Sequence, residues 1–138
     1  MLSVQRLYIE HTKVTPEIRF SPDENIFIIR GNSSPEDVRA LYYPVIEWIK
    51  IFIDDVIKGE RLVTRENPLK FQFDLHYFNS SSAKFLFDIL TELKRLISGG
   101  IPVVTEWFYD SDDPEQKQAG ADISGMAGIP LSFVPKNK

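Results

Sequence analysis

Two histidines and a run of three serines are the residues of this chain whose types could support chemistry. His11 and His76 are far apart in the sequence, and Asp74 shares a predicted strand face with His76. Two ligands are too few for a metal site, so we interpret this pair as part of a solvated strand face. His76 also lies four residues before Ser80, but the serine is not in a Gly-x-Ser-x-Gly motif, so a Ser/His hydrolase is an alternative that the motifs do not favour.

The acidic segment 110–113 resembles the start of a calcium loop in composition but not in pattern. If Asp110 is taken as the first position of such a loop, Pro114 occupies the fifth position, and the glycine required at the sixth position is missing. We interpret the segment as the start of a helix. The chain also lacks cysteine, a Gly-x-Gly-x-x-Gly motif and a P-loop motif. We therefore expect no catalytic residue, no cofactor and no metal ion.

The segment Asn79-Ser80-Ser81-Ser82 stands between a predicted strand and a predicted helix. Serine hydroxyls in this place could simply cap the free amides of the helix, as in a constitutive scaffold. A hydroxyl here also lies beside the positive end of a helix dipole, where a phosphoryl group would be stabilised. A scaffold and a phosphorylation switch therefore both remain open from the residues alone.

The elements that position this segment follow from hydrophobic periodicity. Residues 69–78 alternate apolar and polar side chains, which predicts a strand with one face on the core and the other toward solvent or a partner. Helical spacing predicts one helix capped by Ser34, with Pro35 at its first position, and a second that ends at Gly99. On the outer face of the second helix, Lys84 and Asp88 are predicted to form an i,i+4 ion pair. Further strands are predicted at 17–20, 26–30, 101–109 and 131–134, with 6–9 as an extra edge, and a third helix at 114–126.

The resulting order, β-β-α-β-α-β-α-β, predicts an α/β fold in a single domain of residues 1–138. Right-handed crossovers would place the first two helices on the same face of one mixed β-sheet and leave the other face partly open. Aromatic residues make up 12% of the chain, and Trp48 and Phe52, together with Ile51, widen the apolar stripe of the first helix. We interpret these residues as core, with a docking or dimer surface as the alternative.

Composition excludes several classes of partner. The chain has 16 basic and 20 acidic residues and a net charge of -4, so nonspecific binding to nucleic acid is not expected. No apolar run approaches the length of a membrane span, and the absence of cysteine fits a reducing compartment. We expect a cytoplasmic protein that binds neither nucleic acid nor membrane.

An ordered set of short motifs covers nearly the whole chain. They are Thr15-Pro16-Glu17-Ile18, Ser34-Pro35-Glu36-Asp37, Val45-Ile46-Glu47-Trp48-Ile49, Phe78-Asn79-Ser80-Ser81-Ser82 with Asp88-Ile89-Leu90, Trp107-Phe108-Tyr109 and Ile129-Pro130-Leu131. In this set the sequence resembles the SiaC family of bacterial regulatory phosphoproteins. The resemblance implies a STAS-like fold, similar to that of anti-sigma factor antagonists, with helices packed on one face of the sheet.

The resemblance also implies a phosphorylation-controlled partner switch without enzymatic activity. The phosphoacceptor would be Ser80, where the family typically has threonine, with Ser81 and Ser82 as alternatives. We expect the surrounding Phe78, Asn79, Ser81, Ser82 and Lys84 to contact the partner. The implied partners are a cognate protein kinase, an opposing PP2C-type phosphatase and a target protein. In the best-known member the unphosphorylated form binds and activates a diguanylate cyclase, in cyclic-di-GMP and biofilm signalling.

Overall fold

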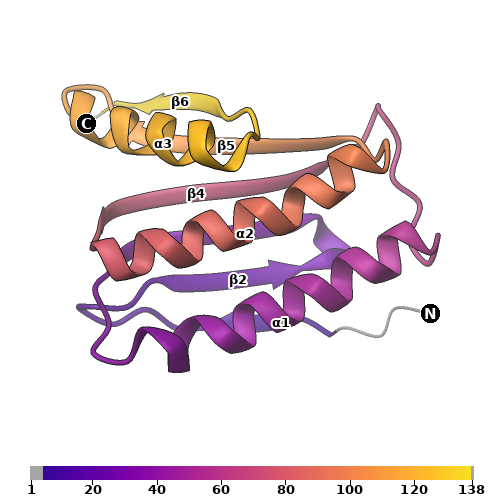
Figure 1. Cartoon of the computed structure of the whole chain (residues 1–138), viewed down its shortest axis with the longest axis horizontal. Helices are drawn as coiled ribbons and strands as arrows, with labels where there is room; N and C mark the ends of the chain where they lie inside the picture. The colour runs from indigo at the N-terminus through magenta and orange to yellow at the C-terminus, as the bar shows by residue number, and fades with distance from the viewer. Residues whose placement is uncertain (1–4, 138) are drawn as a thin grey trace.

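One β-sheet with helices on a single face forms the computed structural model of this chain, which describes residues 5–137 (Figure 1). Its strands are β1 (Leu7–Ile9), β2 (Glu17–Ser21), β3 (Ile26–Ser33), β4 (Leu69–Phe78), β5 (Val103–Asp110) and β6 (Ser132–Lys136). Its α-helices are α1 (Val38–Ile57), α2 (Ser80–Ser98) and α3 (Pro114–Ala127), and a short 3-10 helix, η1 (Pro22–Glu24), connects β2 to β3.

The sheet is mixed, and its strands lie side by side in sequence order. The strands β1, β2 and β3 pair antiparallel, whereas β3 to β6 pair parallel. Each parallel connection contains one helix, and right-handed crossovers place all of these helices on the same face, as Figure 1 shows. The predicted α/β architecture, its element order and the extra edge strand are confirmed.

The core lies between the helices and the covered face of the sheet. The apolar residues of β4 alternate as predicted, and Phe71 and Phe73 are at most 2% exposed. The Phe71 ring stacks on Phe27 with centroids 4.4 Å apart, and Trp48 stacks on the fully buried Phe52 at 5.3 Å. The core interpretation is therefore confirmed for Phe52 and for Trp48, which is partly buried and packs against the core. It is wrong for Ile51, which is 37% exposed.

The predicted start of the first helix is wrong by three residues. The helix α1 begins at Val38, and its cap is Asp37, whose side chain accepts a hydrogen bond from the amide of Ala40 at 3.1 Å. The chain is still extended at this point, because β3 pairs with β4 as far as Ser33, and the amide of Ser34 donates to the carbonyl of Val14. Long-range pairing thus keeps the chain extended past the local cap signal.

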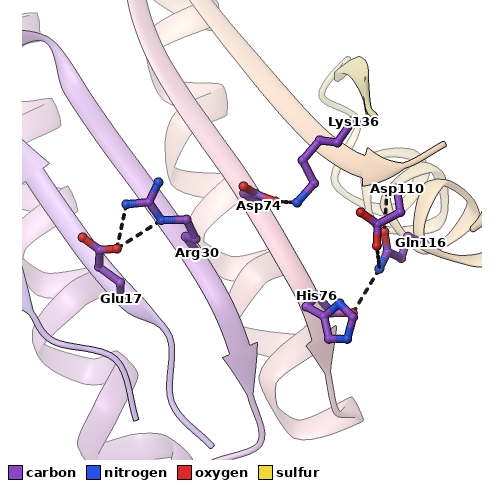
Figure 2. A network of polar contacts seen from close by, with 7 residues as sticks. All are labelled: Glu17, Arg30, Asp74, His76, Asp110, Gln116 and Lys136. Atoms are coloured by element: carbon purple, nitrogen blue, oxygen red, sulfur yellow. Dashed lines mark hydrogen bonds and ion pairs between the residues drawn. The ribbon is translucent and has the colours of Figure 1, made fainter. Parts of the chain in front are cut away.

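The uncovered face of the sheet carries the polar half of the predicted alternation. Figure 2 shows two of its ion pairs, Arg30 with Glu17 at 2.7 Å and Lys136 with Asp74 at 2.5 Å. These pairs join neighbouring or nearby strands, which explains why charged residues are tolerated in the middle of a sheet. Among residues 5–137, no helix is long and apolar enough to span a bilayer.

Candidate phosphorylation site at the start of α2

Asn79 directly follows β4 and caps α2. Its side-chain Oδ1 accepts hydrogen bonds from the amide of Ser82 at 2.9 Å and from the hydroxyl of Ser81 at 3.1 Å. Its own amide donates to the carbonyl of Ser33 at the end of β3, at 3.0 Å. The cap is therefore an asparagine, and the alternative in which the serine hydroxyls cap the helix is wrong.

The three serines have different environments although they are adjacent in the sequence. Ser80 is exposed, and its hydroxyl makes no hydrogen bond within the described residues. Ser81 is also exposed, but its hydroxyl is bound to Asn79. Ser82 is 0% exposed, and its Oγ donates to the carbonyl of Ser33 at 3.0 Å and accepts from the Ser33 hydroxyl at 2.8 Å. Of the three hydroxyls, only that of Ser80 is both accessible and unengaged.

A buried cluster of hydroxyl groups fixes the first turn of α2 to the rest of the fold. It consists of Ser33 from β3, Tyr42 from α1 and Ser82 from α2, with Ser33 Oγ 2.7 Å from Tyr42 Oη. The Tyr42 ring also stacks on Phe85 with centroids 5.5 Å apart. Burial raises the pKa of the Tyr42 hydroxyl, although hydrogen bonds to Ser33 and Ser82 oppose the shift. Ser80 is thus presented on a rigid support.

Lys84 is the basic residue one helical turn beyond Ser80. Its Nζ lies 2.9 Å from Asp88 Oδ2, which confirms the predicted i,i+4 pair, and 4.8 Å from the centre of the Phe85 ring. Its side chain is 68% exposed. Lys84 and Asp88 also line a groove of about 510 Å³ between α1 and α2, whose opposite wall includes the exposed Tyr43.

Phe78 belongs to a second, smaller cavity of about 240 Å³ beside the first turn of α3. Its ring packs edge-on against Trp107 with centroids 5.8 Å apart. Gln116 of α3 closes this region: its Oε1 accepts from the amide of Asp110 at 2.7 Å, and its Nε2 donates to the carbonyl of His76 at 3.2 Å (Figure 2). Asp113 caps α3, as the acidic segment predicted.

The geometry required for a Ser/His hydrolase is not present in the described part of the chain. No hydrogen bond joins the side chains of His76 and Ser80 there, and Asp74 is engaged by Lys136 on the open face of the sheet. Within residues 5–137, His76 and Asp74 are not part of any group of three potential metal ligands.

Sequence reasoning missed three residues that hold the site together. Ser33 and Tyr42 anchor the start of α2, and Gln116 fixes the start of α3. Ser33 is 49 residues from Ser82 in the sequence, so no local spacing could have revealed the contact. Gln116 had one signal, its position three residues after the cap Asp113.

Comparisons with known proteins extend over nearly the whole chain. The family model described as SiaC family regulatory phosphoprotein matches residues 9–136. A curated but uncharacterised protein of Pseudomonas aeruginosa strain UCBPP-PA14 is 36% identical over 127 residues, which cover 92% of this chain and 94% of that protein.

Solved structures agree with this assignment. The crystal structure of apo-SiaC from Pseudomonas aeruginosa is 29% identical, with a TM-score of 0.73, over 96% of this chain and 99% of that chain. A chain in the crystal structure of the diguanylate cyclase SiaD in complex with its activator SiaC, also from Pseudomonas aeruginosa, is 29% identical with a TM-score of 0.79 over the same shares. The chain therefore belongs to the SiaC family of regulatory phosphoproteins.

Proposed function

We propose that this protein is a partner switch controlled by phosphorylation of Ser80. A cognate kinase transfers the γ-phosphoryl group of ATP to Ser80 Oγ and releases ADP and a proton. A PP2C-type phosphatase returns the hydroxyl by hydrolysis and releases inorganic phosphate. The need for ATP places this cycle in the cytoplasm. The unphosphorylated protein binds its target, and the phosphorylated protein does not.

The observation that carries the choice of residue is the difference among the three serines. Ser80 is exposed and its hydroxyl is free to be modified, whereas Ser82 is fully buried and bound to Ser33. A kinase must bring the acceptor oxygen in line with the γ-phosphate of ATP, which a buried hydroxyl cannot reach. Ser81 remains the alternative acceptor, at the cost of its bond to Asn79. Burial of Ser82 also argues against its side chain contacting a partner directly.

The proposed target is a diguanylate cyclase. SiaC of Pseudomonas aeruginosa is the activator of the cyclase SiaD, with which it forms a complex, and this chain is similar to it along almost its full length. A phosphoryl group adds nearly two negative charges at pH 7 to a helix start that carries no acidic residue. At an interface that holds the unmodified hydroxyl, those charges would have to be desolvated, which weakens the complex.

Phosphosite mapping tests the assignment of Ser80. The protein is incubated with ATP and its cognate protein kinase, and the modified peptide is sequenced by mass spectrometry. We expect phosphate on Ser80 and no modification of the Ser80→Ala variant, with Ser81→Ala as the control that is still modified. Phosphate found only outside residues 80–82 would contradict the site.

A further inference from the structure

We propose that Lys84 responds to phosphorylation of Ser80 by leaving its ion pair with Asp88 and binding the phosphoryl group instead. In the unmodified chain the ammonium of Lys84 is paired with Asp88 at 2.9 Å. A phosphoryl group on Ser80 draws this ammonium toward the start of α2 and leaves the Asp88 carboxylate without it. This inference rests on the proposed function, because it describes the consequence of modifying the same serine.

The helix geometry favours this exchange. Ser80 and Lys84 are four residues apart in α2, so their side chains share one face of the helix. Helical side chains tilt toward the N-terminus, which directs the stem of Lys84 toward the first turn. An acidic group four residues before a lysine is also the better order for an ion pair, and the pair of Lys84 with Asp88 has the reverse order.

Charge favours the same direction. Phosphoserine carries about 1.5 to 2 negative charges at pH 7, compared with about one for the carboxylate of Asp88. The phosphoryl group would also sit at the positive end of the helix dipole, whereas Asp88 lies in the middle of α2. The Lys84 side chain is 68% exposed and is therefore free to move between the two partners.

The exchange alters the groove between α1 and α2. Two acidic residues, Glu47 and Asp88, and two basic residues, Lys50 and Lys84, line this groove in the unmodified chain. When the ammonium of Lys84 moves away, the groove keeps both acidic residues but only one basic residue, Lys50. Phosphorylation thus changes the charge of a surface a full helical turn away from the phosphate, in addition to adding charge at Ser80.

Titration of the phosphate tests the proximity of Lys84 without a kinase or a target. Phosphoserine is incorporated genetically at position 80, and its second ionisation is followed by phosphorus NMR. We expect Lys84→Gln to raise the pKa of the phosphate by about 0.3, the size typical of an exposed ion pair. Lys70→Gln, at the far end of β4, is the matched control and leaves that pKa unchanged. Equal pKa values in both variants would overturn the proposal.

A crystal structure of the chain with phosphoserine at position 80 tests the exchange itself. We expect Lys84 Nζ within hydrogen-bonding distance of a phosphate oxygen and no longer paired with Asp88. Lys84 still paired with Asp88 would contradict the inference. Neither experiment uses a partner, so its failure is distinguishable from failure of the proposed function, which mapping and partner binding test separately.

Discussion

The starts of α2 and α3 lie at the same edge of the sheet but differ in charge. The helix α3 begins with the acidic cap Asp113 and has Glu115 in its first turn. The helix α2 begins with the neutral cap Asn79 and has no acidic residue in its first turn. Even α1, which also lacks an acidic first turn, uses the carboxylate of Asp37 as its cap.

At the start of α3, acidic side chains already balance the positive end of the helix dipole, whereas the start of α2 has no such charge and can receive one by modification. The carboxylates of Asp113 and Glu115 supply the negative charge that the dipole of α3 favours, and Gln116 ties the helix to β4 and β5. At α2 the cap Asn79 is neutral, and the hydroxyl of Ser80 has no hydrogen-bond partner within the described part of the chain. Added charge therefore changes the surface most at α2.

The largest stability effect is expected where α3 is tied to the sheet. Gln116→Ala removes the side-chain hydrogen bonds to Asp110 and to the carbonyl of His76, so we expect a loss of about 2 kcal/mol in the free energy of unfolding. Gln118→Ala is the matched control, because among residues 5–137 the Gln118 side chain binds only the exposed Asp122. Urea denaturation measures both. A similar, small loss in the two variants would show that Gln116 does not anchor α3.

An intermediate effect is expected beneath the first turn of α2. Ser82→Ala removes a buried hydroxyl that is bound twice to Ser33 and should cost about 1 to 2 kcal/mol. Ser80→Ala removes an exposed, unengaged hydroxyl and should change the free energy of unfolding by less than about 0.5 kcal/mol. Thermal or urea unfolding of the pair checks the contrast. Equal costs would contradict the different roles assigned to these serines.

A smaller effect is expected when the cap charges are exchanged. Asn79→Asp gives α2 the kind of cap that α3 has, and we expect it to stabilise the protein by about 0.5 kcal/mol at pH 7, because a carboxylate favours the helix dipole. Asp113→Asn should cost a similar amount in α3. Both changes should shrink in 1 M salt. A destabilising or salt-independent effect of Asn79→Asp would argue against an uncompensated dipole at α2.

Periodicity in the sequence was sufficient to predict the sheet and the helices. The alternation of apolar and polar side chains in residues 69–78 identified β4 and predicted that one face of the sheet is uncovered. The burial pattern of β4 agrees with this prediction. The start of α1 could not be predicted, because Ser34 and Asp37 are both good caps and the sequence does not show that β3 pairs with β4 as far as Ser33. Local signals place a helix, but long-range pairing decides where it begins.

The sequence located the candidate site, but it did not show which residue caps α2 or which of the three serines is buried. The serine run pointed to the right turn of the chain, and the neighbouring asparagine proved to be its cap. Burial of Ser82 depends on Ser33 and Tyr42, which belong to other elements, so the sequence could not separate Ser82 from Ser80. Lys84 was paired with Asp88 from spacing alone, because both residues lie on one helix.

The affinity of the target diguanylate cyclase for this protein tests the central claim most directly. Isothermal titration calorimetry would compare the unmodified chain, the chain with phosphoserine at position 80, and that same chain after treatment with the PP2C-type phosphatase. We predict binding weaker by about tenfold or more, equivalent to about 1.4 kcal/mol, for the phosphorylated chain, with recovery after dephosphorylation. Equal affinity of the unmodified and phosphorylated chains would contradict the switch.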